Sequence, residues 1–315
     1  MSQYTSPSLT TPEIPSITLP DGRKISYFTY GPSATSDNPS PPTIIYLHGF
    51  PMSGMEATHL DALAHQKGLR IIAPSRPGYS TSTPSPNFTI LSVTSDLSNF
   101  LSALQISTFA ILASSGGAPY ALSLATVLAP SRLKGIAIFS GLYPLALGSQ
   151  GMQWSPWLVY QLAYYTPSLL HSAFDAQMGK LARDVEKPER FEHAVMHQMQ
   201  GRPEVDLDAM KDPGIKSAVI EGAREAVRVT SEGAMREGAV LGMEWGFRLE
   251  DVKVKTWIWH GGLDGQAPAN MARAAGEKIP GAEVEVLEKE GHVSVVLKRR
   301  EMALDWLKES LLDSS

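Results

Sequence analysis

Residues 111–120 read ILASSGGAPY, and the expected architecture of the whole chain follows from them. An apolar run ends at two serines, and a helical pattern begins directly after them. A sharp strand-to-helix turn lifts one side chain above the edge of a sheet, and it needs small residues two positions before and after that side chain. With Ser115 at the tip, those positions hold Ala113 and Gly117, whereas moving the tip back by one residue would bring in bulky Leu112. The spacing therefore predicts Ser115 as a nucleophile.

Apolar strands and helices alternate on both sides of this turn. The strand patterns are TIIYLHG from residue 43, LRIIAP, STFAILAS, LKGIAIFS, VKTWIWHGG and AEVEVLE. Apolar strands joined through helices are typical of a parallel sheet covered on both faces. Near the N-terminus, SITLP and RKISYFTYG flank Asp21-Gly22, which is a hairpin signal. We therefore predict an α/β fold with a mostly parallel central sheet flanked by helices and an N-terminal antiparallel hairpin.

One long segment interrupts the alternation. Residues 143–248 show helical patterns without a convincing buried strand, which predicts a helical lid inserted into the sheet domain. We expect 1–15 to be a loose tail, and 16–142 together with 249–315 to form the core domain. The more charged second half of the lid, from Asp175 to about Arg248, is expected to face water.

Two later loops supply partners for the serine. Asp264 follows the strand pattern VKTWIWHGG, and His292 stands in EGHVS, directly before the final helical pattern. The order Ser115, Asp264, His292 is that of one class of Ser-His-Asp enzymes. It predicts that His292 acts as general base and that Asp264 orients its imidazole. The alternative is a glycine-rich turn with an unrelated surface histidine, and three correctly ordered residues on the expected junctions weigh against it.

An acyl-transfer site also needs two backbone N–H groups aimed at the oxyanion. One is expected from Gly116, the residue after the nucleophile. The other is expected from Phe50, in the loop after the strand that contains Tyr46. His48 lies in the same loop, but it precedes Ser115 in the chain, so we expect it to brace the turn rather than to act as base.

Five motifs resemble those of a known family: HGFP at 48–51, RPGYSTS at 76–82, SSGGAPYALSLA at 114–125, EWGFRLEDV at 244–252 and HGGLDGQAP at 260–268. They are similar to the α/β-hydrolase-fold superfamily, and within it to the alpha/beta-hydrolase-1-type serine hydrolases. The resemblance covers nearly the whole chain after residue 16. It implies the α/β-hydrolase fold and an enzyme with a serine nucleophile.

The chain departs from the family pattern at two positions. Ala113 replaces the first glycine of G-x-S-x-G and is still small. Ser75 stands where many relatives have Asp, at a position that is normally structural. Relatives with an aspartate nucleophile, the haloalkane dehalogenases and epoxide hydrolases, do not fit, because the turn carries Ser115.

Bulk properties exclude several classes of protein. The net charge of −5 and the pI near 5.9 argue against a nucleic-acid binder, and the absence of cysteine excludes thiol catalysis. The N-terminal residues lack the features of a secretory signal, so we predict a cytoplasmic protein. Glycine and proline interrupt the two long uncharged stretches, which excludes an integral membrane segment. We predict no cofactor and no metal, because the chain has no phosphate loop, no dinucleotide fingerprint and no HExxH around His193 and His197.

The first part of the lid, 141–174, contains no Lys, Arg, Asp or Glu and is rich in aromatics. Because pockets are mainly apolar, we expect some of its side chains to line the substrate pocket and to favour a small hydrophobic substrate. The candidates are Met152, Trp154, Trp157, Tyr160 and Tyr164. The alternative is that these residues only form the packing of the lid.

Three functions remain open. The first is hydrolysis of an ester, thioester or lactone through an acyl-enzyme. The second is an acyltransferase or cyclase that uses the same triad with another acceptor. The third is a non-catalytic ligand-binding protein on the same scaffold.

Overall fold

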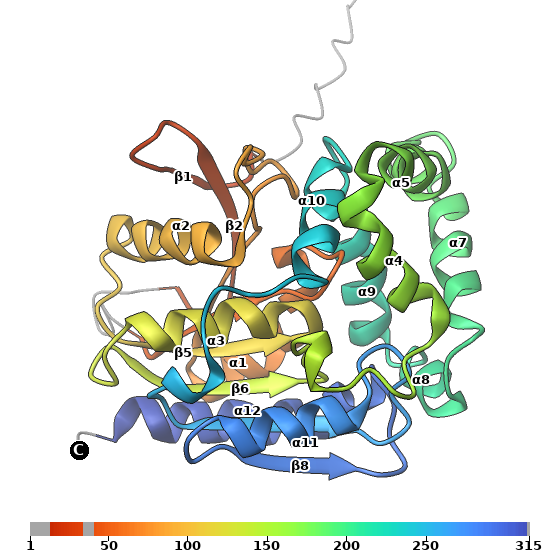
Figure 1. Cartoon of the computed structure of the whole chain (residues 1–315). Coiled ribbons are helices and arrows are strands. Elements are labelled where there is room, and N and C mark those ends of the chain that lie inside the picture. Colours follow the sequence, from red (N-terminus) through yellow and green to blue (C-terminus); the bar gives the residue numbers. More distant parts are fainter. Residues whose placement is uncertain (1–12, 34–40, 314–315) are drawn as a thin grey trace, which may run out of the picture.

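A computed structural model describes residues 13–33 and 41–313, and its centre is one eight-stranded sheet (Figure 1). The strand order is β1-β2-β4-β3-β5-β6-β7-β8. β1 pairs antiparallel with β2, β2 pairs antiparallel with β4, and all later pairs are parallel. The strands are β1 (Ser16–Thr18), β2 (Lys24–Tyr30), β3 (Thr43–Leu47), β4 (Arg70–Pro74), β5 (Phe109–Ser114), β6 (Leu133–Phe139), β7 (Thr256–Gly261) and β8 (Glu283–Leu287). The predicted fold class is confirmed, including the hairpin.

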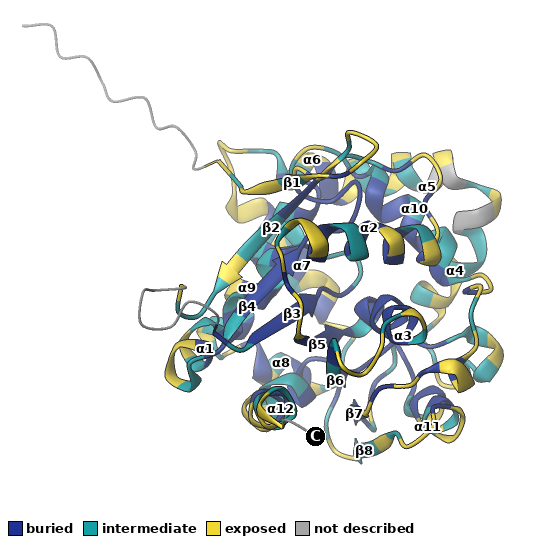
Figure 2. Ribbon diagram, turned by 90° about the vertical axis from the view of Figure 1, so that its left-hand side faces the viewer, coloured by how far each residue is buried: buried dark blue, intermediate teal, exposed yellow. Residues whose placement is uncertain are grey.

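Helices cover both faces of the sheet, so its central strands are buried on both sides. α2 (Ile90–Ala103), α3 (Ala118–Val127) and α11 (Ala269–Lys278) pack on one face. The 3-10 helix η1 (Gly54–Leu60), α1 (Asp61–Lys67) and α12 (Ser294–Leu312) pack on the other. All residues of β3 and β5 are buried, which explains their uninterrupted apolar sequences. Figure 2 shows the central strands as buried and the outer surfaces of the helices as exposed.

A helical segment connects β6 to β7. It comprises η3 (Leu145–Leu147), α4 (Trp154–Tyr165), α5 (Pro167–Phe174), the π-helix η4 (Asp175–Gly179), α6 (Lys180–Ala182), α7 (Glu189–Met199), α8 (Glu204–Ala209), α9 (Pro213–Ala226), α10 (Glu232–Leu241) and η5 (Leu249–Asp251). In Figure 1, α4, α5, α7, α9 and α10 gather at one end of the molecule. We propose residues 143–248 as one unit, called the lid below. None of the described helices is long and apolar enough to cross a membrane.

The prediction that the charged half of the lid faces water is wrong for two residues. Asp206 on α8 and Glu237 on α10 are completely buried. Asp206 accepts hydrogen bonds from the loop before α12, and Glu237 pairs with Arg76 of the core domain. These partners lie far away in the sequence, so the local charge pattern of the lid does not reveal that the two carboxylates are satisfied inside the protein.

Candidate active site

A tight turn between β5 and α3 presents Ser115. Its φ angle is +47°, in the left-handed region that non-glycine residues seldom adopt and that is often found at functional sites. The Ser115 carbonyl accepts a hydrogen bond from the Leu142 N–H at 3.0 Å, which ties the turn to the end of β6. A Cβ atom on Gly117 would lie 2.1 Å from the Leu47 carbonyl oxygen, so only glycine fits there. This local geometry is that of the predicted strand-to-helix turn.

Phe50 and Gly116, the residues with the two predicted N–H donors, lie close together. A Cβ atom on Gly116 would be 2.7 Å from the Cβ and 3.1 Å from the backbone nitrogen of Phe50. The loop after β3 therefore packs directly against the first peptide of the turn. Gly116 has no side chain, and this lets the two backbones approach closely.

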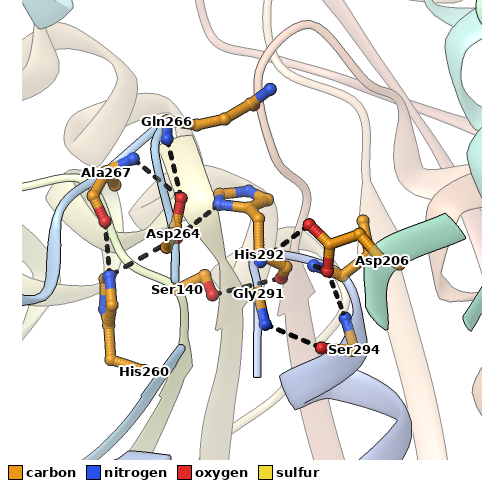
Figure 3. Close-up of polar contacts among 10 residues, drawn as sticks. Ser140, Asp206, His260, Asp264, Gln266, Ala267, Gly291, His292 and Ser294 are labelled. Atoms are coloured by element: carbon orange, nitrogen blue, oxygen red, sulfur yellow. Dashed lines mark hydrogen bonds and ion pairs between the residues drawn. The ribbon is translucent and has the colours of Figure 1, made fainter. Parts of the chain in front are cut away.

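Asp264 and His292 are joined by a hydrogen bond. The Nδ1 of His292 lies 2.7 Å from Oδ2 of Asp264 (Figure 3). The second carboxylate oxygen accepts from the backbone N–H groups of Gln266 at 2.8 Å and Ala267 at 3.1 Å. Burial alone would raise the pKa of Asp264, but the imidazole of His292 and the hydrogen bonds from His260 and His292 lower it well below its ordinary value. Asp264 is therefore an ionised carboxylate that holds the Nδ1–H form of His292.

His260 is a second histidine at the same carboxylate. Its Nε2 lies 2.5 Å from the Ala267 carbonyl oxygen and 3.4 Å from Oδ2 of Asp264. A carbonyl oxygen only accepts, so Nε2 carries the proton. His260 is completely buried at the end of β7 and fixes the loop that carries Asp264. Sequence reasoning quoted this residue in HGGLDGQAP but gave it no role.

Asp206 fixes the backbone on the other side of His292. It accepts from the N–H groups of His292 at 3.0 Å, Val293 at 2.8 Å and Ser294 at 2.9 Å (Figure 3). A Cβ atom on Gly291 would lie 2.5 Å from the Asp206 carboxylate. The histidine loop is thus built around a carboxylate from the lid. Only long-range contacts reveal this, so sequence reasoning missed it.

Arg76 holds the loop that carries Phe50. Its guanidinium donates to the carbonyls of His48 at 2.6 Å and Gly49 at 3.0 Å, and its Nε lies 2.7 Å from Oε1 of Glu237. His48 bonds through Nδ1 to the Gly49 carbonyl at 2.8 Å and accepts from the Arg76 N–H at 3.2 Å. Burial and the neighbouring Arg76 lower the pKa of His48 well below its usual value. His48 is therefore a neutral brace of the loop.

A model of the alpha/beta hydrolase fold matches residues 42–298. The chain belongs to the alpha/beta hydrolase fold family. A search of curated proteins gave no match.

Similar solved structures support the fold of this alpha/beta hydrolase. An esterase from Exiguobacterium antarcticum is 18% identical, with 94% of this chain and 98% of that chain covered and a TM-score of 0.63. The enol-lactonase from Burkholderia xenovorans LB400 is 17% identical, with 95% and 100% covered and a TM-score of 0.63. A bromoperoxidase from Bacillus anthracis is 16% identical, with 91% and 96% covered and a TM-score of 0.64. At these identities the similarity shows the fold alone.

The predicted pocket residues of this alpha/beta hydrolase lie in different environments. Tyr160 is partly buried, with its ring centre 6.2 Å from that of Phe50, and Met152 packs against the main core. Trp154 and Trp157 are 75% and 43% exposed, so neither lies in an enclosed pocket. Tyr164 belongs to the same helix, but its side chain lies outside the described part of the chain. The described residues contain no group of three or more His, Asp or Glu side chains that could hold a metal ion.

Proposed function

We propose that this alpha/beta hydrolase is a serine hydrolase that cleaves an ester, thioester or lactone of a hydrophobic small molecule. Ser115 is its nucleophile, His292 its general base, and Asp264 the residue that orients His292. The observation that carries the proposal is the 2.7 Å hydrogen bond between His292 and Asp264. In addition, His292 and Ser114, the neighbour of Ser115, line the same cavity.

The proposed reaction has two halves. His292 takes the hydroxyl proton of Ser115 through Nε2, and the Ser115 oxygen attacks the substrate carbonyl carbon. The N–H groups of Phe50 and Gly116 stabilise the oxyanion, and His292 returns the proton to the leaving oxygen or sulfur atom. Water then attacks the acyl-enzyme with His292 again as base, and the acid product leaves. Asp264 stabilises the imidazolium that forms in each half.

A fluorophosphonate probe tests the proposal directly. We expect covalent labelling of Ser115 in the folded protein, no labelling in Ser115→Ala, and normal labelling in the matched control Ser114→Ala. If the probe labels the protein and the probe-free protein, given an ester substrate and an added alcohol or amine, transfers the acyl group to that acceptor in place of water, an acyltransferase is favoured. A folded protein that the probe does not label would overturn the proposal and favour a ligand-binding protein.

Substrate class is tested with matched esters. Met152 and Tyr160 are the lid side chains that we propose to contact substrate, because both pack near the core and Tyr160 meets Phe50. We expect a higher kcat/KM for neutral apolar esters than for charged esters of the same size. A preference for charged esters would contradict the proposed apolar pocket.

A further inference from the structure

His292 is one of the residues that line a cavity of about 60 Å³. Its polar lining comes from Tyr46 of β3, Glu56 and His59 of η1, and Ser114 at the end of β5. α9 of the lid, which packs against η1, adds an apolar wall together with the start of α12. None of these four polar side chains has a role in the proposed triad or oxyanion hole.

Glu56 lies close to the nucleophile in space. Its Oε2 accepts a hydrogen bond from the Gly49 N–H at 2.7 Å. A Cβ atom on Gly49 would lie 3.3 Å from Oε1 of Glu56 and 3.4 Å from Cβ of Ser115, so the carboxyl group and the serine flank the same glycine. Burial raises the pKa of Glu56, against the opposing effects of the Gly49 N–H, Tyr46, Arg76 and His292. The cavity therefore has a carboxyl group close to the proposed nucleophile.

His59 supplies an unpaired polar atom. Its side chain is buried, and its Nδ1 has no hydrogen-bond partner among the described residues. Burial, reinforced by the charge of Arg300, lowers the pKa of His59 to about 3, so the ring is neutral near pH 7. An unpaired polar nitrogen in a buried site needs a small hydrogen-bonding partner.

The size and polarity of the cavity identify the ligand class. A polar cavity holds a water molecule once it offers about 10–15 Å³ and two to four polar partners. Pockets for drug-sized molecules are roughly 300–1,000 Å³, far larger than this one. The four polar side chains and His292, in an otherwise apolar lining, and the volume of about 60 Å³ match water.

We propose that this cavity binds the water molecule that hydrolyses the acyl-enzyme, with Glu56 accepting one of its hydrogen bonds. This inference rests on the proposed function. The water passes one proton to Nε2 of His292 while its oxygen bonds to the acyl carbon. The bond from that carbon to the Ser115 oxygen then breaks, Ser115 regains the proton from His292, and the carboxylic acid leaves. Glu56 and His59 orient the water and take no part in proton transfer.

Pre-steady-state kinetics with 4-nitrophenyl acetate separate the two halves of the reaction. Glu56→Gln keeps an oxygen for the Gly49 N–H, and Ala218→Val fills the cavity from α9. In both variants we expect acylation within about twofold of wild type and deacylation slower by about tenfold or more, because a displaced water is poorly oriented. Acetyl-Ser115 should accumulate and be detectable by mass. Ala223→Val, on the same helix but outside the cavity lining, is the matched control and should behave as wild type.

Each other outcome counts against the inference. Acetyl-Ser115 that forms and decays at the wild-type rate in both variants would overturn the water site while leaving the proposed function intact. Acylation and deacylation that slow together would show a substrate or structural role for the cavity. If no acetyl-Ser115 forms in the wild type or the variants, the proposed function fails and this inference fails with it. Thermal unfolding checks that each variant is folded, and Glu56→Gln tests the inference alone if Ala218→Val does not fold.

Discussion

Ser115 combines a strained backbone with neighbours that cannot be enlarged. Its φ is +47°, and the end of β3 and the loop after it leave no room for a side chain at Gly116 or Gly117. The requirement for small residues could therefore be read directly from ILASSGGAPY. The predicted turn was local, and local sterics were enough to place it.

Ser115→Ala should abolish turnover of any ester that the protein cleaves, by about 10⁴-fold or more, because no other group replaces the nucleophile. The loss of one oxygen atom should leave the fold intact. Steady-state hydrolysis and circular dichroism check this, with Ser114→Ala as control. Substantial activity in Ser115→Ala, together with an inactive Ser114→Ala, would refute the assignment.

Asp264→Asn tests the residue that orients the base. The Asn side chain keeps nearly the shape of the carboxylate but loses the charge that holds the Nδ1–H form of His292. One carboxylate oxygen becomes an NH₂ group, which cannot accept hydrogen bonds from His292 or from the two backbone N–H donors. We expect kcat to fall by about 10³- to 10⁴-fold with a smaller change in KM. Saturation kinetics measure the two effects. A rise in KM with an unchanged kcat would contradict the role.

At the scale of elements, sequence reasoning located strands and helices of the core domain but missed contacts between the lid and the core. Alternating apolar runs predicted the parallel sheet because central strands are buried on both faces. Asp264 and His292 could be predicted because each stands at the junction of a recognisable element. Asp206 could not, since the three backbone N–H groups that it accepts from lie far away in the chain.

Asp206 makes α8 part of the histidine loop. Asp206→Ala removes the acceptor of three backbone N–H groups, so we expect a loss of stability of about 2–3 kcal/mol and a displaced His292. A displaced base should lower kcat more than it raises KM. Denaturant unfolding and saturation kinetics measure both, with the exposed Asp208→Ala on the same helix as control. Equal effects of the two substitutions would contradict the positioning role.

At the scale of the whole molecule, a buried ion pair joins the lid to the loop that carries Phe50. Glu237 contacts the Arg76 guanidinium and accepts a hydrogen bond from the Tyr79 hydroxyl. Glu237→Ala leaves the buried guanidinium unpaired, and we expect a loss of about 3–5 kcal/mol in the free energy of unfolding. Chemical denaturation tests this against the exposed control Glu244→Ala. A loss no larger than that of the control would show that the pair is not needed for stability.

Buried neutral histidines should make the stability of the whole protein depend on pH. The pKa of His59 is lowered to about 3 by burial and by Arg300, whereas an unfolded histidine titrates near 6.5. Between these values the unfolded chain binds more protons than the folded protein, so stability is complete above about pH 6.5 and falls as the pH decreases.

From pH 7.5 to pH 5.0, His59 alone should lower the free energy of unfolding by about 2 kcal/mol. His48 has a lowered pKa for a similar reason and acts in the same direction. Glu56 and Glu225 have raised pKa values and act in the opposite direction, so the prediction concerns a difference between variants. Over this pH range we expect the free energy of unfolding of His59→Gln to fall by about 2 kcal/mol less than that of the wild type. The exposed control His193→Asn should show the same fall as the wild type. Urea unfolding at both pH values measures the difference. If His59→Gln has the same pH dependence as the wild type, the pKa of His59 does not differ between the folded and unfolded protein. The unpaired nitrogen beside the Glu56 cavity would then need another explanation.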